Sequence, residues 1–387
     1  MFSNRTNWKL TRNRLTETLE QVIASGARVL DLTVSNPTRA GLRYDETRIL
    51  QSLSSPQAMD YDPQPKGLSN ARAAVADYYQ TQHRIPRLDP ERLILTTSTS
   101  EGYSFVFRLL CNPGDELLVP KPSYPLFEFL ADLQDVKLVP YPLIYDHGWQ
   151  MDSSSLQKAV TSRTRGVLVV HPNNPTGSFV QPQELDSLNH FCREHALAII
   201  ADEVFLDYSH DRSTPQSFVA NHHVPTFTLS GVSKISGLPQ MKLAWIVASG
   251  PAAEVEGAKA RLEIIADTYL SMNAPIQWAT PVFLEQRKSI QQQLLGRILT
   301  NLAELDRQLA AQKSCRRLHV EGGWYAVLRV PVIQTDEELA IDLLSRKSVL
   351  IHPGHFYDFP QDGYLVASLI TPPDDFRQGT QSMLEMF

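Results

Sequence analysis

The stretch GVLVVHPNNPTG, residues 166–177, is a short apolar run followed by a polar turn that contains proline and glycine. Because the apolar run is continuous and rich in β-branched residues, it predicts a strand buried on both faces, as in a parallel sheet covered by helices. The same order returns in LAIIADEVF at 197–205 and in TFTLSGVSKISG at 226–237. Three such units point to a repeated strand-and-turn architecture.

Apolar runs alternate with amphipathic segments from about residue 93 onward. Seven strands are predicted, at 93–96, 116–119, 137–139, 166–170, 197–201, 226–229 and 243–247. Helices are predicted at 71–82, 102–110, 126–133 and 183–195. This alternation is typical of an α/β protein with a mostly parallel sheet, here seven-stranded.

The chain is expected to divide into two domains. We expect a large domain at 46–280, near the end of which Pro275 and Pro281 should interrupt the chain. A long helix is predicted over 283–312, of a length that often bridges two domains. The tail mixes strands and helices without clean alternation. Residues 1–45 and 281–387 are therefore expected to form a small α+β domain.

Bulk composition excludes several classes of function. The net charge of −6 gives no basic field for nucleic acid or for an acidic membrane surface. No window approaches the roughly 20 apolar residues of a membrane span, and the N-terminus has no apolar signal-peptide core. The three cysteines, Cys111, Cys192 and Cys315, form no disulfide framework. We expect a cytoplasmic protein without nucleic-acid or membrane partners.

Three polar residues follow three of the predicted strands: Asn174, Asp202 and Lys234. In open α/β sheets ligands collect beyond the carboxyl ends of the strands, so these side chains are expected to meet. They supply a hydrogen-bond donor, a carboxylate and an amine, which is what a protein needs to hold pyridoxal phosphate as an electron sink. Taken singly, each has a simpler interpretation: a turn asparagine, a helix N-cap and a surface lysine.

A phosphate site is predicted in TTSTSEG at 96–102, between a strand and a helix. Hydroxyls and amides of Ser98, Thr99 and Ser100 at a helix N-terminus could bind the cofactor phosphate. Ordinary N-capping, with Glu101 in the first helical turn, is the alternative.

Two further residues are candidates for the same pocket. Lys242 could add a positive charge to the phosphate, and Tyr124 could stack on the cofactor ring or be a core aromatic. His352 and His355 have no third ligand at metal spacing, so no metal site is expected.

With these motifs in hand, the chain resembles the class I/II, fold-type I, pyridoxal-phosphate-dependent aminotransferases over nearly its whole length. The resemblance implies that Lys234 forms the Schiff base with the cofactor and that Ser233 binds its phosphate. YDPQPKG at 61–67 is similar to a family segment whose tyrosine, here Tyr61, reaches the phosphate bound by the partner subunit. The resemblance therefore implies a homodimer with shared active sites.

The departures from the family pattern concern substrate binding most. Val366 in GYLVASLIT stands where the family has an arginine that binds the substrate α-carboxylate. Phe205 replaces a tyrosine that donates to the cofactor 3′-oxygen, and Lys242 replaces an arginine. Arg39, beside Asn36 in the SNPT turn, is the leading substitute contact for the substrate, with Arg43 and Arg377 as weaker candidates; a solvated loop arginine is the alternative.

The predicted function is transfer of an amino group from an amino acid to a 2-oxo acid through Lys234. A lyase that eliminates from Cα or Cβ, such as a C–S lyase, would use the same cofactor residues and is the first alternative. A non-catalytic regulatory protein that binds the cofactor is the second.

Overall fold

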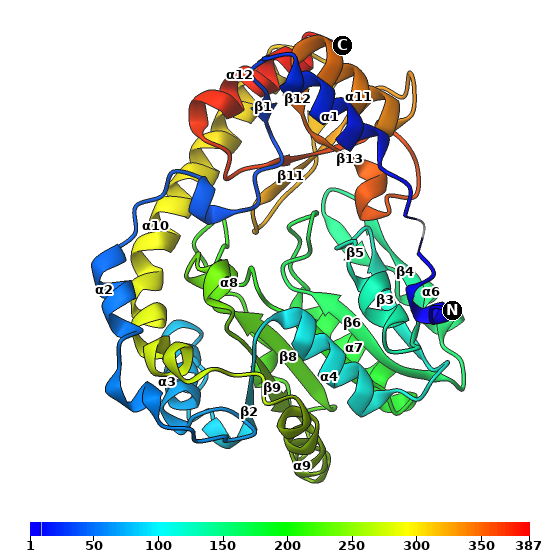
Figure 1. Ribbon diagram of the computed structural model, residues 1–387. Helices are drawn as coiled ribbons and strands as arrows, with labels where there is room; N and C mark the ends of the chain where they lie inside the picture. Colours follow the sequence, from blue (N-terminus) through cyan, green and yellow to red (C-terminus); the bar gives the residue numbers. More distant parts are fainter. Residues whose placement is uncertain (9) are drawn as a thin grey trace.

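The main element of the computed structural model, which describes residues 1–8 and 10–387, is an eight-stranded sheet (Figure 1). In spatial order its strands are β2 (Leu93–Thr96), β9 (Ala244–Ser249), β8 (Thr226–Gly231), β7 (Ala198–Asp202), β6 (Thr164–Val170), β3 (Glu116–Lys121), β4 (Lys137–Tyr145) and β5 (Trp149–Met151). Strands β8, β7, β6, β3 and β4 are parallel to their neighbours in this run, whereas β9 is antiparallel to both β2 and β8. The predicted mostly parallel α/β architecture is confirmed.

The strand number predicted from the sequence is wrong by one. All seven predicted strands lie in the sheet, and β5 adds an eighth at the edge, antiparallel to β4. It has only three residues, which is too few to show a period of two, so no pattern in the sequence indicated it.

Helices cover both faces of this sheet. Helices α4 (Thr99–Leu110), α5 (Phe127–Asp132) and α9 (Ala252–Tyr269) share one apolar core with the sheet. On the other face, α6 (Ser153–Ala159) and α7 (Pro182–Glu194) share a second core, and α3 (Ser69–Gln82) shares a third. Successive residues of a strand serve opposite faces, as Ile94 and Leu95 of β2 do.

The longest helix, α10, runs from Ala274 to Ala310 and corrects the expected break near residue 281. Pro275 occupies the first turn, where a missing N–H costs nothing, and Pro281 lies inside the helix. The buried face of α10, including Phe283 and Leu284, packs on the core that contains α3. This packing outweighs the local cost of Pro281.

A second, smaller assembly lies at the other end of α10 (Figure 1). A four-stranded sheet has the order β10 (Arg316–Arg317), β11 (Tyr325–Arg329), β14 (Tyr364–Ser368), β13 (His352–Pro353), all antiparallel. Strand β1 (Leu30–Asp31) pairs in parallel with β12 (Val349–Leu350), and α1 (Arg14–Ala24), α11 (Asp336–Lys347) and α12 (Pro373–Leu384) complete it. The division at 280/281 falls inside α10, and the domain boundaries stay a prediction.

Short helices complete the chain. They are α2 (Glu46–Ser52), α8 (Val232–Ile235) and the 3-10 turns Asn4–Thr6, Pro37–Arg39, Pro56–Met59, Pro90–Arg92, Phe218–Ala220, Pro239–Met241 and Gly354–Tyr357. No helix within 1–8 and 10–387 is long and apolar enough to cross a membrane. What matters for function is that β6, β7 and β8 are adjacent and parallel, so the turns after them lie at one edge of the sheet.

Candidate active site

Asn174, Asp202 and Lys234 come together at the carboxyl ends of β6, β7 and β8. The register pairs Val170 with Asp202, and Asp202 with Leu229, so the three strands end nearly level. The loop after β6 is tied to β7 because the His171 N–H donates to the Asp202 carbonyl over 2.8 Å. The sheet edge thus gathers an amide, a carboxylate and an amine, as the strand-end rule predicts.

Lys234 is half-buried as a residue, and its amine lies against aromatic rings. Its Nζ lies 4.7 Å from the ring centroid of Trp324 and 5.6 Å from that of Phe205. Burial lowers the pKa of Lys234 from 10.5 to about 8, while the nearby charge of Asp202 opposes this shift. The uncharged, nucleophilic share of this amine at neutral pH is therefore much larger than for an exposed lysine, although the protonated form still predominates.

Asp202 is 6% exposed and firmly held. The Tyr103 hydroxyl donates to Oδ2 over 2.7 Å, and the Val204 N–H donates to Oδ1 over 3.1 Å. Burial raises the pKa of Asp202, while these two hydrogen bonds and the charge of Lys234 lower it. The carboxylate is thus oriented, desolvated and within electrostatic reach of the Lys234 amine.

Asn174 carries an unused hydrogen-bonding group. It is 8% exposed, and its Oδ1 is buried without a partner among the described residues. The loop that holds it turns at Gly177, where φ is +69°, and the Gly322 N–H donates to the Gly177 carbonyl over 2.9 Å. A buried amide with a free polar atom is a place where a ligand can complete the hydrogen bonding.

Tyr124 follows β3 and lies within electrostatic reach of Asp202. It is half-buried, and both burial and the charge of Asp202 raise the pKa of its hydroxyl to about 12. Its ring meets that of Phe127 edge to face at 5.6 Å. The alternatives of ring stacking and core packing are therefore both compatible with its position.

The segment with Ser98, Thr99 and Ser100 forms the start of α4. Strand β2, which precedes it, runs parallel to β8 because both are antiparallel to β9, so α4 begins at the same sheet edge. The Ser98 Oγ accepts a hydrogen bond from the Glu101 N–H at 3.2 Å, which is N-capping. Capping by Ser98 is thus observed, and phosphate binding by the three residues stays a prediction.

Two residues near the Lys234 turn have roles that nothing yet tests. Ser233 is half-buried in α8. Lys242 is exposed and has a left-handed backbone conformation with φ of 51°; the next residue, Leu243, accepts a hydrogen bond from the Val232 N–H at 3.0 Å. The chain therefore returns to α8 at Lys242.

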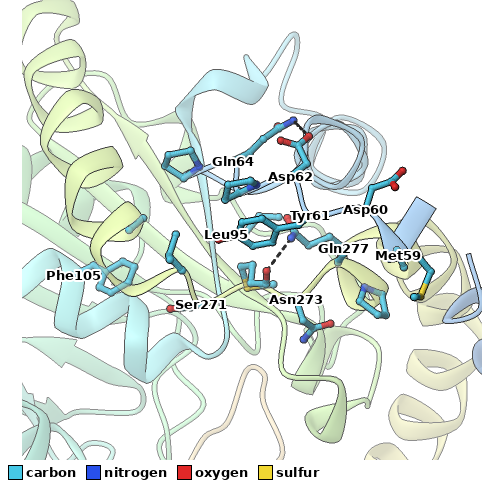
Figure 2. A pocket seen from close by; sticks show the side chains of 18 residues that line it. Met59, Asp60, Tyr61, Asp62, Gln64, Leu95, Phe105, Ser271, Asn273 and Gln277 are labelled. Carbon is cyan, nitrogen blue, oxygen red and sulfur yellow. Dashed lines mark hydrogen bonds between the residues drawn. The ribbon is translucent and has the colours of Figure 1, made fainter. Parts of the chain in front are cut away.

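Tyr61 lies apart from these residues and is 81% exposed. Figure 2 shows it at a cavity of about 400 Å³, together with Gln64, Asn273 and Gln277. The cavity lies between the segment 58–65 and the residues around the start of α10. Within one chain, Tyr61 does not join the site at the ends of β6 to β8.

The residues expected to bind substrate are exposed. The Asn36 Oδ1 accepts bonds from the Thr38 N–H at 3.0 Å and from its hydroxyl at 2.8 Å, so it caps a short turn. Arg39 extends into solvent and makes no ion pair with any residue in 1–8 or 10–387. The weaker candidate Arg43 is also exposed.

Val366 and the last arginine candidate lie in the smaller assembly. Val366 is fully buried in β14, paired with Val327 and His352. The guanidinium of Arg377 lies 3.9 Å from the carboxylate of Asp374. Val366 therefore has Val327 and His352, and no arginine, as its partners in the sheet.

Sequence reasoning missed three aromatic residues of the site. Tyr103 holds Asp202, the Tyr208 hydroxyl donates to the Lys234 carbonyl over 2.6 Å, and Trp324 covers the amine. Tyrosines within apolar segments look like core residues in a sequence, and only their partners reveal the hydroxyl roles. No cluster of three or more potential metal ligands occurs in the part of the chain that the structure describes.

Comparison with known proteins identifies a family. The family of class I and II aminotransferases matches residues 7–371. An alanine aminotransferase of Mycobacterium tuberculosis is 28% identical over 360 residues, covering 90% of this chain and 83% of that protein. A glutamate-pyruvate aminotransferase of Escherichia coli is 27% identical over 343 residues, covering 87% and 84%.

Solved structures show the same fold. An aminotransferase from Escherichia coli superposes with a TM-score of 0.88 at 25% identity, covering 100% of this chain and 98% of that one. An alanine aminotransferase from Pyrococcus furiosus gives 0.90 at 20% identity, covering 100% and 99%. This chain belongs to the class I and II aminotransferases.

Proposed function

We propose that the site at the ends of β6, β7 and β8 binds pyridoxal phosphate and transfers an amino group from an amino acid to a 2-oxo acid. The observation that carries the proposal is the Lys234 amine, whose pKa of about 8 results from burial next to the oriented carboxylate of Asp202. A nucleophilic amine and a buried carboxylate are the two groups that this chemistry requires of the protein.

The residues present fit the cofactor. The NH2 group of Asn174 could donate to the ring 3′-oxygen, and the carboxylate of Asp202 suits the protonated ring nitrogen. The start of α4, with the hydroxyls of Ser98, Thr99 and Ser100, offers amides and a helix dipole to the phosphate. When bound, the cofactor supplies an electron sink for charge that develops at the substrate Cα.

Each protein group then has a defined task. Lys234 would hold the cofactor covalently and, as a free amine, would take up and return the proton of the substrate Cα. Asp202 keeps the ring nitrogen protonated, while Tyr103 keeps Asp202 in place. The rings of Phe205 and Trp324 exclude water from the amine, which maintains its lowered pKa.

A homodimer with shared active sites is part of the proposal. The phenol of Tyr61 is exposed in the single chain and lies at the cavity drawn in Figure 2, beside exposed Met59. Such a surface supports a contact with a second copy, in which Tyr61 would reach the phosphate of the partner's site. The phosphate would then accept hydrogen bonds from the start of α4 in one chain and from Tyr61 in the other.

For substrates, the relatives named alanine and glutamate-pyruvate aminotransferase suggest alanine and glutamate as first donors and pyruvate as first acceptor. Val366 offers no charge for the α-carboxylate, so we assign that contact to the solvent-exposed Arg39, with Asn36 shaping its turn. A cytoplasmic location is supported by three cysteines that are all free.

The test uses two inactive variants and their mixture. Lys234→Ala should lose amino transfer from glutamate to pyruvate, and Tyr61→Ala should bind the cofactor weakly. Unfolding and refolding the two together forms hybrid dimers, in which one site combines the intact Lys234 with the partner's intact Tyr61. About a quarter of all sites would then be wild type, so activity should return.

Three results would contradict the proposal. Wild-type transfer by Lys234→Ala would refute the role of that lysine. A refolded mixture no more active than its two components would refute the shared site. Release of pyruvate and ammonia from an amino acid without need of an acceptor would instead identify a lyase.

A further inference from the structure

A buried polar network contacts the turn that carries Lys234. Its centre is Asp207, whose side chain has no solvent exposure, and His83 is almost equally buried. The Asp207 Oδ1 accepts from the Tyr78 hydroxyl at 2.9 Å and lies 2.8 Å from the His83 Nε2. The Asp207 Oδ2 accepts from the Gln291 Nε2 at 2.5 Å.

Gln291 connects this network to the turn. Its Nε2 also donates to the Ile235 carbonyl over 2.9 Å, and the Tyr208 hydroxyl donates to the neighbouring Lys234 carbonyl over 2.6 Å. Helix α8 has only four residues, and its end has few backbone bonds, from the Ser236 N–H to the Val232 carbonyl at 3.0 Å and from the Gly237 N–H to the Lys234 carbonyl at 3.3 Å. Side-chain donors from α10 and from the segment after β7 therefore anchor two successive carbonyls of the turn.

The acceptor character of Asp207 sets the orientation of the Gln291 amide. Because Nε2 serves Asp207 and Ile235 together, both of these partners must be acceptors. The carboxylate accepts on both sides, from the Tyr78 hydroxyl at Oδ1 and from the Gln291 Nε2 at Oδ2. An asparagine at residue 207 has only one acceptor oxygen, so it can keep the bond to Gln291 only by turning its NH2 group toward the Tyr78 hydroxyl, which then loses this acceptor. The carboxylate is therefore the group that satisfies both contacts in the observed orientation.

We propose that Asp207 and Gln291 are positioning residues, which fix the α8 turn so that the Lys234 amine is held against Trp324 and Phe205. The functional consequence of this positioning rests on the proposed role of Lys234. The hydrogen bonds of Asp207 and Gln291 themselves lie within the protein. Arg287, whose guanidinium lies 5.1 Å from the Tyr78 ring centroid, closes the network at its far side.

The experiment measures backbone hydrogen exchange in the peptide 232–238 of the holoenzyme and of the cofactor-free protein. Asp207→Asn and Gln291→Leu should each increase exchange in this peptide at least about tenfold. The matched control is Asn301→Leu, since the Asn301 amide, also on α10 and buried, donates to the carbonyls of Leu369 and Thr371 at 2.9 and 2.8 Å. This control should destabilise the protein but leave 232–238 unchanged.

A spectroscopic readout separates positioning from simple stabilisation. In the holoenzyme, the pH midpoint of the visible cofactor absorbance should move upward by at least about half a unit in Asp207→Asn and Gln291→Leu. A looser turn would expose the bond between Lys234 and the cofactor to water, which favours the protonated, charged form of that bond. It should not move in Asn301→Leu. Tyr78→Phe, which removes one donor to Asp207 and leaves Gln291 in place, should give a smaller shift in the same direction.

Unchanged exchange in 232–238 for both Asp207→Asn and Gln291→Leu, with melting temperatures lowered as in Asn301→Leu, would overturn the inference. If no visible absorbance forms in the wild type, the role of Lys234 itself is wrong. The exchange measurement on the cofactor-free protein still decides whether Asp207 and Gln291 position the turn.

Discussion

The edge formed by β6, β7 and β8 and the face of the smaller sheet around β14 differ in how they hold polar groups. At the first, Asp202 and Lys234 are desolvated, and the charge of each affects the pKa of the other. The Tyr103 hydroxyl donates to the Asp202 carboxylate, and the Tyr208 hydroxyl donates to the Lys234 carbonyl. At the second, Val366 is buried among strands, and the arginine assigned to the substrate, Arg39, extends into solvent. The cofactor-facing region is thus preorganised in the single chain, whereas the substrate-facing region is not.

The largest expected effect comes from removing the charge in the preorganised region. Asp202→Asn should lower kcat/KM about a thousandfold, which corresponds to about 4 kcal/mol, because a neutral amide cannot keep the ring nitrogen protonated. Steady-state kinetics measure this. Glu203→Gln is the control, since this neighbouring carboxyl bonds to Ser217 and Phe218 instead; equal losses in both variants would show that burial, not the ring contact, matters.

The lowered pKa of Lys234 predicts how stability depends on pH. The amine titrates at about 8 in the folded chain and at 10.5 when exposed, so the folded state binds fewer protons between these values and its stability rises with pH there. Cofactor-free Lys234→Met should be more stable than the wild type by up to about 3 kcal/mol below pH 8. This advantage should vanish by about pH 10.5 in urea unfolding; an advantage independent of pH would contradict the shift.

A smaller effect is expected from the support of Asp202. Tyr103→Phe should lower kcat/KM about tenfold, because Asp202 loses a hydrogen-bond donor and part of its orientation. Tyr141→Phe removes an equally buried hydroxyl, one that donates to the Leu168 carbonyl over 2.9 Å, far from Lys234 in the sheet order. Each of the two substitutions should lower the free energy of unfolding by about 1 kcal/mol, but Tyr141→Phe should leave the activity unchanged. Equal activities of the two variants would remove Tyr103 from the site.

The smallest effect should come from the substrate-facing region. Arg39→Gln should raise the KM for glutamate about threefold with kcat nearly unchanged, since an exposed charge contributes little to binding. Arg193→Gln, which changes an exposed arginine at the end of α7, serves as the control. Indistinguishable KM values for the two variants would rule out Arg39 as the carboxylate contact and would require another cation.

The two regions also differ in what the sequence could predict. Asn174, Asp202 and Lys234 were identifiable because each follows a buried strand, and parallel strands bring their ends together. Tyr103 and Gln291 were not, since both lie within helices, where a buried aromatic or amide gives no sign of its partner. Their partners lie 99 and 56 residues away in the chain, a separation that only the fold closes.

The helix break expected at Pro281 failed for a related reason. Local propensity favours an interruption there, but the packing of α10 against α3 is a long-range contact that sequence patterns do not report. The three-residue strand β5 was likewise below the length at which alternation can be seen.

The most direct test of the difference between the two regions is to trap the cofactor on the protein. Purified protein incubated with pyridoxal phosphate is reduced with borohydride and digested, and the modified peptide is sequenced by mass spectrometry. We expect one pyridoxyl group per chain on Lys234, and none on exposed Lys242, because burial lowers the pKa of Lys234 to about 8. Modification of Lys242 or of several surface lysines, with Lys234 free, would contradict the assignment.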